Sequence, residues 1–361
     1  MQGVRKQFPA LTHSIYANTA ATGLLSQSLV EWRQEHDLDY LVGGSDAKME
    51  QMEIISTTRA TIGNFFSCPA PSIALVQNFS LGLNMLLEGL EKSSRILLVE
   101  NDYPSVNWPF ESRGFQITFA KLDQDLEQHI WEKIASEQID VLALSLVQWL
   151  NGIKIELDFL KKLKENFPDL LIIADGTQFC GAYDFNFASS GIDILGASGY
   201  KWLLSGFGNG FMLFKEEIQN KLKLYTTGYN SSGINIEKKD SFRFAKHFEP
   251  GHLDTLNFGS LNFALEYLHQ IGIHDIEAHN KLLMQKAKKE FASLGLLSND
   301  VLNRDDHSTI FNIKVNQHTF SLLTEHNVVC SQRGEGIRLS FHLYNTPAEI
   351  DQISEILKKS M

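Results

Sequence analysis

Cysteine is scarce in this sequence, and its scarcity excludes two classes of protein. The 361 residues contain three cysteines, Cys68, Cys180 and Cys330, which lie far apart and form no C-x-x-C pair. Such an odd, widely spaced set argues against a disulfide framework and against a cysteine-based zinc site. Twelve histidines occur without an H-E-x-x-H motif, so we expect no metal centre.

Basic clusters and long apolar runs are also missing. The chain has 32 basic and 43 acidic residues, for a net charge of -11, and no basic block attracts nucleic acid or anionic lipid. No stretch approaches the roughly 18 apolar residues that a membrane span needs. The N-terminal residues lack the apolar segment of a secretory signal. We therefore expect a cytoplasmic protein with no nucleic-acid partner and no membrane partner.

What the sequence does contain is a regular alternation of short apolar runs and amphipathic segments. This alternation predicts an α/β fold with a mainly parallel sheet. The runs over 140–147 and 170–174 are apolar on both faces, as expected of strands covered by helices on both sides. The predicted strands span 72–77, 95–99, 116–120, 140–147, 170–174, 192–197 and 210–214. The predicted helices span 27–40, 53–66, 81–90, 125–137 and 157–166.

The pattern changes near Thr255. Two long helical patterns, over 260–271 and 275–293, precede short strands and a last helix over 348–359. We therefore predict a large α/β domain over residues 16–254. A smaller α+β domain spans 255–361 and includes an N-terminal arm, residues 1–15.

The best candidates for catalytic residues lie at or just after the ends of two predicted strands. Asp175 ends the LLIIAD run, and Lys201 follows the run that ends in Gly-Ala-Ser. Ligands of open α/β sheets bind beyond the carboxyl ends of the strands. Taken alone, Asp175 is equally well explained as a turn residue. Burial of Lys201 would lower the pKa of its amine, which Schiff-base chemistry requires.

A third segment supplies an anion site. The strand over 72–77 leads into a helix for which Ser80 is a candidate N-cap. A helix start binds a phosphate monoester through its free N–H groups. An anion site, an acid and a strand-end lysine together are what pyridoxal 5′-phosphate (PLP) needs, with Asp175 keeping the pyridine nitrogen protonated.

These segments resemble the class V aminotransferases, the cysteine-desulfurase-like group of fold-type I PLP enzymes. The resemblance extends from Tyr16 to about Asp351, and its most specific part is Asp–x–x–Gln followed by Ser–x–x–Lys. It implies a seven-stranded sheet flanked by helices and a homodimer with its active site between subunits. The catalytic residues that it implies are Lys201 and Asp175. The cofactor-binding residues are Phe79, Ser80, Tyr103, Asp175, Gln178, Ser198, Tyr200, Lys201 and Thr255, and the substrate-binding residues are Arg338, Arg333, Asn18, Ala20 and Trp149.

The resemblance also assigns particular roles. Tyr103 would stack on the ring, Gln178 would contact the phenolic oxygen, and Thr255 would reach a neighbouring subunit's phosphate. Arg338 would bind the substrate carboxylate with help from Arg333, since an arginine fork suits a carboxylate.

Three positions depart from the family pattern. Tyr200 stands where histidine often precedes the lysine, and Trp149 stands where desulfurases tend to have asparagine. Phe79 replaces a frequent threonine, so a backbone N–H must bind the phosphate there.

The reaction is less constrained than the cofactor. Desulfurases need a cysteine on a loop between the two C-terminal arginines, and the four residues between Arg333 and Arg338 include none. Cys330 lies just upstream, in a predicted strand, and is better explained as a packed side chain. We therefore expect an aminotransferase that acts on an α-amino acid and a 2-oxo acid through a Lys201 Schiff base. The alternative is an epimerase or lyase of the same family.

Two other classes of protein fit the sequence less well. The SGFGNGF segment, residues 205–211, superficially resembles a dinucleotide-binding loop, but it enters a predicted strand where that motif needs a helix. A binding protein without catalysis is disfavoured by the joint presence of Lys201, Asp175 and Arg338.

Overall fold

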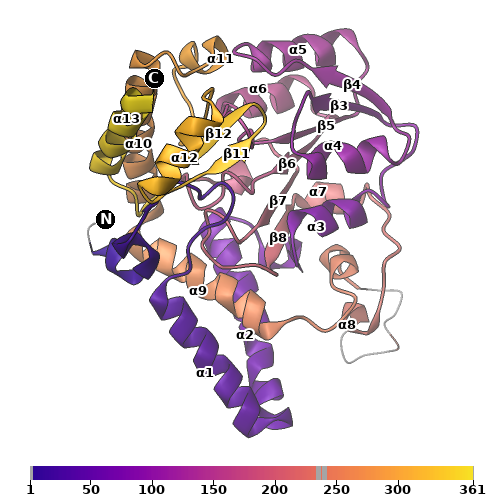
Figure 1. The fold of residues 1–361 in the computed structure, drawn as a ribbon. Helices are drawn as coiled ribbons and strands as arrows, with labels where there is room; N and C mark the ends of the chain where they lie inside the picture. Colours follow the sequence, from indigo (N-terminus) through magenta and orange to yellow (C-terminus); the bar gives the residue numbers. More distant parts are fainter. Residues whose placement is uncertain (1–2, 233–236, 238–241, 361) are drawn as a thin grey trace.

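A seven-stranded sheet forms the centre of the molecule. The computed structural model describes residues 3–232, 237 and 242–360. The strand order is β2-β8-β7-β6-β5-β3-β4, and only β8 runs antiparallel to its neighbours (Figure 1). The strands are β2 (Ile73–Val76), β3 (Arg95–Val99), β4 (Gln116–Ala120), β5 (Val141–Ser145), β6 (Leu171–Asp175), β7 (Ile194–Ser198) and β8 (Gly210–Phe214). The predicted fold class is confirmed, and residues 205–211 lead into β8 with no helix between them.

Alternate residues of the strands enter two different hydrophobic cores, because successive side chains point to opposite faces of a sheet. In β5, for example, Leu142 and Leu144 join one core, whereas Val141 and Ala143 join the other. The first core contains residues of α2 (Ser45–Phe66), α5 (Leu126–Ser136), α6 (Leu157–Asn166) and α9 (Thr255–Ile271). The second contains residues of α3 (Phe79–Leu86) and α4 (Pro104–Glu111). Helices thus cover both faces of the sheet, as the apolar strands predicted.

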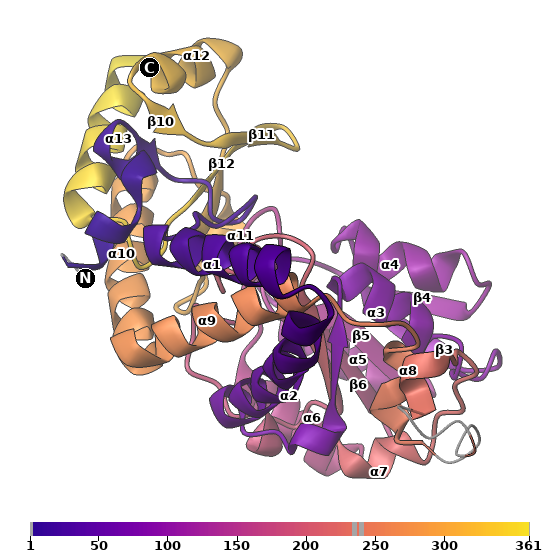
Figure 2. The ribbon, with the colours of Figure 1, turned by 90° about the horizontal axis from the view of Figure 1, so that it is seen from below.

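Two observed helices differ from the prediction for identifiable reasons. Helix α4 was not predicted, because Pro104 and Pro109 interrupt its sequence pattern. Pro104 occupies the first turn, where proline is tolerated. Helix α2 begins at Ser45, eight residues before the predicted start, and with α1 (Gln27–Gly43) it forms a long hairpin that projects from the body in Figure 1. Figure 2 shows the same two helices from below.

The C-terminal part has its own small sheet and its own core. Strands β11 (Ser331–Arg333), β12 (Gly336–Ser340) and β9 (Ile310–Ile313) pair antiparallel in that order. Helices α10 (Ile273–Ser293), α12 (Gln317–Glu325) and α13 (Pro347–Ser360) surround them. The remaining short helices are α7 (Glu216–Gln219), α8 (Tyr229–Ser232) and α11 (Asn299–Leu302).

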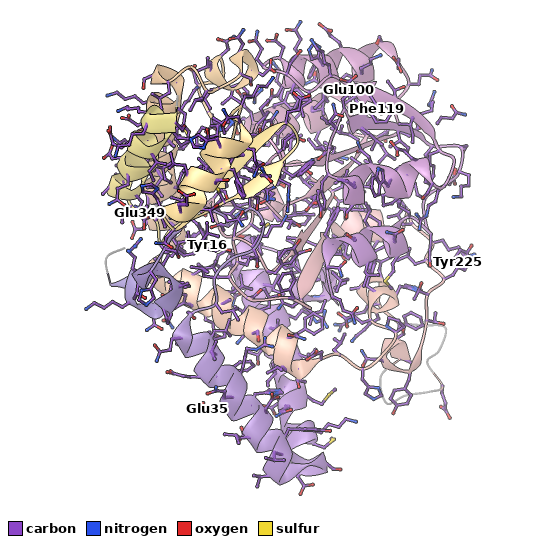
Figure 3. The ribbon with its side chains drawn as sticks, viewed as in Figure 1. Tyr16, Glu35, Glu100, Phe119, Tyr225 and Glu349 are labelled. Carbon is purple, nitrogen blue, oxygen red and sulfur yellow. The ribbon has the colours of Figure 1, made fainter. Side chains whose placement is uncertain are left out.

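The N-terminal arm packs on this C-terminal part. Strand β1 (Ile15–Tyr16) pairs in parallel with β10 (Val328–Val329). Asn345 donates one hydrogen bond from its side-chain amide to the Tyr16 carbonyl and another to the Glu349 carboxylate. Tyr16 and Glu349 accordingly lie near one another in Figure 3, whereas Glu35 marks the distant hairpin. The arm therefore brings residues 17–24 between the two sheets.

Candidate active site

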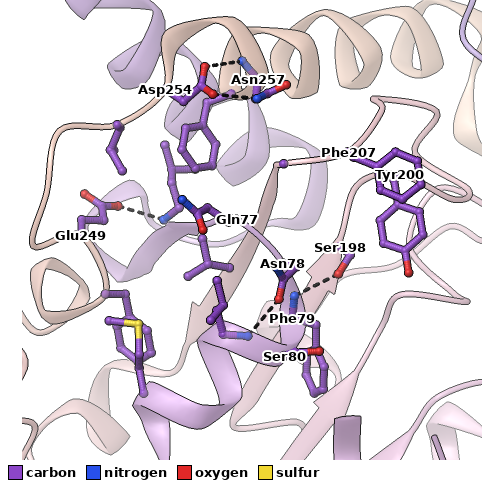
Figure 4. Close-up of a pocket in the computed structure, with 18 of the residues that line it drawn as sticks. Gln77, Asn78, Phe79, Ser80, Ser198, Tyr200, Phe207, Glu249, Asp254 and Asn257 are labelled. Atoms are coloured by element: carbon purple, nitrogen blue, oxygen red, sulfur yellow. Dashed lines mark hydrogen bonds between the residues drawn. The ribbon is translucent and has the colours of Figure 1, made fainter. Parts of the chain in front are cut away.

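The site lies at the carboxyl edge of the central sheet. Ser145, Asp175 and Ser198 are the last residues of the adjacent strands β5, β6 and β7. A cavity of ≈ 970 Å³ opens there, and Figure 4 shows part of its wall. Of the predicted cofactor-binding residues, Phe79, Ser80, Tyr103, Asp175, Ser198 and Tyr200 line this cavity.

Asp175 and Lys201 are both buried beside this cavity, each with 5% of its surface exposed. Burial raises the pKa of the Asp175 carboxyl, while bonds from Thr177 and the Lys201 charge oppose the rise. Burial lowers the pKa of the Lys201 amine, and Asp175 opposes the fall. Among the described residues, no ion pair within 4.0 Å joins the two groups. The amine and the acid therefore face one site without neutralising each other directly.

A tight turn after β7 holds the lysine in place. Gly23 donates its N–H to the Tyr200 carbonyl at 2.8 Å, which fastens the turn to the N-terminal segment. A Cβ at Gly23 would come within 2.0 Å of the Lys201 carbonyl oxygen, so only glycine permits this approach. The turn thus fixes the backbone from which the Lys201 side chain extends.

The start of α3 is the predicted anion site, and its N-cap is not Ser80, as predicted, but Asn78. Asn78 is the N-cap, and its side chain accepts the Leu81 N–H at 2.9 Å. The Phe79 N–H donates to the Ser198 hydroxyl at 2.9 Å (Figure 4), and the Ser80 hydroxyl donates to Ser105. A helix supplies no internal acceptor for the N–H of Ser80, which has no partner in the described chain. This N–H group and the Ser198 hydroxyl suit a phosphate.

Aromatic rings border the lysine. The Lys201 amine lies 5.3 Å from the ring centroid of Tyr103 and 5.5 Å from that of Tyr200. Tyr200 stacks on Phe207 with ring centroids 4.5 Å apart (Figure 4). Burial raises the pKa of Tyr200 to about 12, so its hydroxyl keeps its proton at neutral pH. Tyr103 is therefore placed to lie against a flat ring attached to Lys201.

Arg338 is a buried cation near the site that forms no ion pair with an acidic side chain of the described residues. It is 3% exposed, and its Nε has no hydrogen-bond partner in the described structure. Its Nη1 donates a hydrogen bond to the Trp149 carbonyl at 2.7 Å. Burial, aided by the charge of Arg333, lowers the pKa of Arg338 to about 10. Arg333 itself is exposed on β11 and donates to the Gln332 carbonyl. A buried arginine without an acidic partner suits the carboxylate of a ligand.

Gln178 and Thr255 lie away from the cavity wall. Gln178 donates to the Ala20 carbonyl at 3.0 Å and accepts from Trp202 at 2.7 Å, so its amide joins three segments of the chain. The Thr255 hydroxyl contacts His36 and Gln51 at the start of α9. Neither residue lines the cavity.

The predicted substrate residues of the N-terminal segment contact β12. Asn18 forms a β-bridge with Ser340, whose hydroxyl accepts the Ala20 N–H at 2.9 Å. The Asn18 side chain accepts a hydrogen bond from Ser331 at 2.7 Å. Asn18 and Ala20 thus connect the small sheet to the turn that carries Lys201.

Sequence reasoning missed two buried polar residues. Thr177 donates its N–H to Asp175 at 2.8 Å and accepts the Ser198 N–H at 3.1 Å, so it links two strand ends. Asp102 is 5% exposed and contacts Tyr103 and Ser145. A signal for Asp102 was available, because it is an acidic residue just after the apolar run of β3.

The comparisons with known proteins agree with this geometry. The family profile for aminotransferase class-V matches residues 15–353. The chain belongs to the class V aminotransferase family. This membership confirms PLP as the cofactor, and the groups described above fit it: a buried amine, an acid and a helix start with a free N–H.

Individual relatives are distant and carry different names. A probable cysteine desulfurase of Methanothermobacter thermautotrophicus is 20% identical, covering 99% of this chain and 97% of that protein. An uncharacterized aminotransferase of Bacillus subtilis is 23% identical over the same shares of the two chains. These names support a PLP enzyme of class V, and they disagree about the reaction.

Solved structures show the same fold. The apo cysteine desulfurase of Thermococcus onnurineus superimposes with a TM-score of 0.87 at 19% identity, covering 99% of this chain and 97% of that one. A C-DES mutant with glycine covalently linked to its PLP cofactor also gives 0.87, at 18% identity, covering 99% of each chain. No helix among the described residues is long and apolar enough to cross a bilayer.

Proposed function

We propose that this protein is a PLP-dependent aminotransferase that transfers the amino group of an α-amino acid to a 2-oxo acid. The observation that carries the proposal is that a buried aspartate and a free helix start line one cavity, and that the buried Lys201 amine lies 5.3 Å from the ring of Tyr103 on the same wall. In this arrangement Lys201 would hold the cofactor through its amine, and Ser198 with the start of α3 would bind the cofactor's phosphate. The bound cofactor supplies an electron sink that stabilises negative charge at the substrate Cα.

Lys201 is the proton carrier in this proposal. Because burial lowers the pKa of its amine, a larger neutral fraction is available at neutral pH to take a proton from the substrate Cα. Its Nζ would be free to hold and return that proton once the substrate's amine had replaced it on the cofactor. The ring of Tyr103, 5.3 Å from the amine, limits the positions that the reacting atoms can take.

Asp175 holds the opposite end of the site. The Thr177 N–H donates to one of its carboxylate oxygens at 2.8 Å, and the buried carboxylate would face the ring nitrogen of the cofactor. An ion pair at about 4 Å and an effective dielectric near 20 gains about 4 kcal/mol before desolvation costs. Asp175 is thus placed to keep a positive charge at that nitrogen.

Arg338 supplies substrate recognition. Its unpaired Nε and its burial leave a guanidinium that an incoming carboxylate can neutralise. The bond from Arg338 to the Trp149 carbonyl, and the edge-on contact between the rings of Trp149 and Tyr103, connect substrate and cofactor sites.

The thiols favour transamination over persulfide-forming desulfuration. Cys68 and Cys180 are buried and Cys330 is half-buried against the small core. Burial raises the pKa of Cys68 and of Cys330 to about 11, and that of Cys180 also rises. A nucleophilic cysteine needs the opposite, an exposed thiol with a lowered pKa.

The test is single-turnover spectroscopy of the PLP-loaded protein with a panel of amino acids, with Lys201→Ala as the matched control. We expect the bound cofactor to change from its aldehyde to its amine form, with one 2-oxo acid released per site. Release of ammonia and pyruvate, or racemised substrate, would instead select the lyase or epimerase alternative. Sulfane sulfur from cysteine would contradict the argument from the thiols.

We further propose that the enzyme is a homodimer. The tip of the α1–α2 hairpin exposes a group of apolar side chains to solvent, and a contiguous exposed apolar patch is typical of a protein–protein interface. These side chains are Leu38, Tyr40, Leu41, Val42, Met49 and Met52. If a second copy of the chain covered this hairpin, the nearby Thr255 of the first copy would come close to the active site of the second copy. Light scattering of the purified protein measures the mass, and a monomer at micromolar concentration would contradict the proposal.

A further inference from the structure

A second buried aspartate lies behind the site. Asp102 follows β3 and precedes Tyr103, and its carboxylate accepts three hydrogen bonds. One oxygen accepts the Tyr103 N–H and the Ser145 hydroxyl, each at 2.6 Å, and the other accepts the Ser145 N–H at 2.8 Å. These bonds explain how an acid survives in this position, since a buried carboxylate without donors is costly.

The two partners of Asp102 connect it to both sides of the ring site. Tyr103 carries the ring that faces the Lys201 amine. Ser145 is the last residue of β5 and is the direct register partner of Asp175 on β6. Asp102 therefore links Tyr103 to the end of β5, which lies next to the end of β6 that carries Asp175.

We propose that Asp102 is a positioning residue that fixes Tyr103 against the cofactor ring and braces the Asp175 strand end through Ser145. The inference rests on the proposed function, because the role of Tyr103 does. Without the Asp102 carboxylate, the N–H groups of Tyr103 and Ser145 lose their acceptor inside the protein. The backbone at both positions then shifts to reach other partners, and the ring site loosens.

The experiment compares variants of Asp102 with a matched buried aspartate at the opposite edge of the same sheet, next to the starts of β6 and β7. Asp193 is 2% exposed and accepts the Ile172 N–H and the Lys164 amine, each at 2.8 Å. We measure the PLP dissociation constant, the visible circular dichroism of bound PLP and the melting temperature of the cofactor-free protein. The dichroism reports the packing around the ring, which a loss of stability alone does not change.

We expect Asp102→Ala to raise the PLP dissociation constant by about tenfold and to alter the visible dichroism. Asp102→Asn keeps one acceptor oxygen and should fall between Asp102→Ala and the unaltered protein. Asp193→Asn should lower the melting temperature while leaving the dissociation constant within about twofold. If Asp102→Ala does not fold, Asp102→Asn and Ser145→Ala decide the question by the same measurements.

Two outcomes distinguish the possible failures. Unaltered protein that does not bind PLP overturns the proposed function together with this inference. If the unaltered protein binds PLP and Asp102→Asn matches Asp193→Asn in affinity and dichroism, Asp102 serves folding alone and only the positioning role is overturned.

Discussion

Replacing Arg338 by methionine should stabilise the cofactor-free protein while it weakens the binding of carboxylate substrates. Burial lowers the pKa of Arg338 from 12.5 to about 10. A tenfold change in an ionisation equilibrium is worth about 1.36 kcal/mol, so the charged form costs roughly 3 kcal/mol in the folded state. The cost is present at every pH below about 10, because the folded pKa lies below the unfolded one.

The hydrogen bond to the Trp149 carbonyl offsets part of that cost. A bond from a charged donor contributes about 1.5 kcal/mol or more. The balance predicts that Arg338→Met raises the free energy of unfolding by about 1–2 kcal/mol, within the range found when buried ions are replaced by apolar side chains. The same change should raise KM for the amino acid by tenfold or more, on the order of 1.4 kcal/mol.

Arg304→Met is the control, because Arg304 is also buried but forms an ion pair with an acidic side chain. It is 7% exposed and binds Glu127 through both Nη atoms, at 2.6 and 2.8 Å. Its removal leaves the Glu127 carboxylate without its partner and should cost about 3 kcal/mol. Urea denaturation of the cofactor-free variants at neutral pH measures both changes. If Arg338→Met proves as destabilising as Arg304→Met, Arg338 has a structural partner and our account of its burial is wrong.

Three further changes test other parts of the site. The rate of PLP uptake by the cofactor-free protein should rise with pH through an apparent pKa below 10.5, since burial lowers the pKa of Lys201; a stopped-flow midpoint at or above that value would contradict this. Asp175→Asn should lower kcat by about 100-fold, roughly 2.7 kcal/mol, and an unchanged kcat would reject its proposed role. Glu249 is buried, yet the Arg59 guanidinium and Lys246 hold the pKa of its carboxyl below the ordinary value. Its contribution is therefore present above pH 4.5 and lost as the pH falls through the lower folded pKa. Glu249→Gln should lower the free energy of unfolding by about 3 kcal/mol at neutral pH and by less at acidic pH. An equal loss at the two pH values, measured by urea denaturation, would refute the pairing of Glu249 with Arg59 and Lys246.

The strands and most helices could be predicted because their signals are local. Three of the predicted strands, 95–99, 116–120 and 210–214, match β3, β4 and β8 residue for residue. Apolar runs of this kind are bounded by polar turn residues, which leave little freedom in where a strand ends. Helix α4 escaped prediction because its stability comes from burying Val106 and Phe110 on the sheet, which outweighs the two prolines.

The start of α3 could not be located exactly from the sequence. Asn78 and Ser80 are both good N-cap residues, two positions apart, and the sequence does not choose between them. The choice follows from the Ser198 hydroxyl on β7, which accepts the Phe79 N–H and so places the first turn. A residue 119 positions away therefore decides where the helix begins.

The sequence by itself determined the strand-end positions of Asp175 and Lys201, because a side chain at the end of an apolar run can be located from the run alone. Only the tertiary structure decided what surrounds them. It placed Asp102 next to Tyr103, left Arg338 buried without an acidic partner among the described residues, and engaged Gln178 with Ala20 and Trp202. These contacts join residues far apart in the chain, and their geometry depends on how the sheet, the helices and the N-terminal arm pack together.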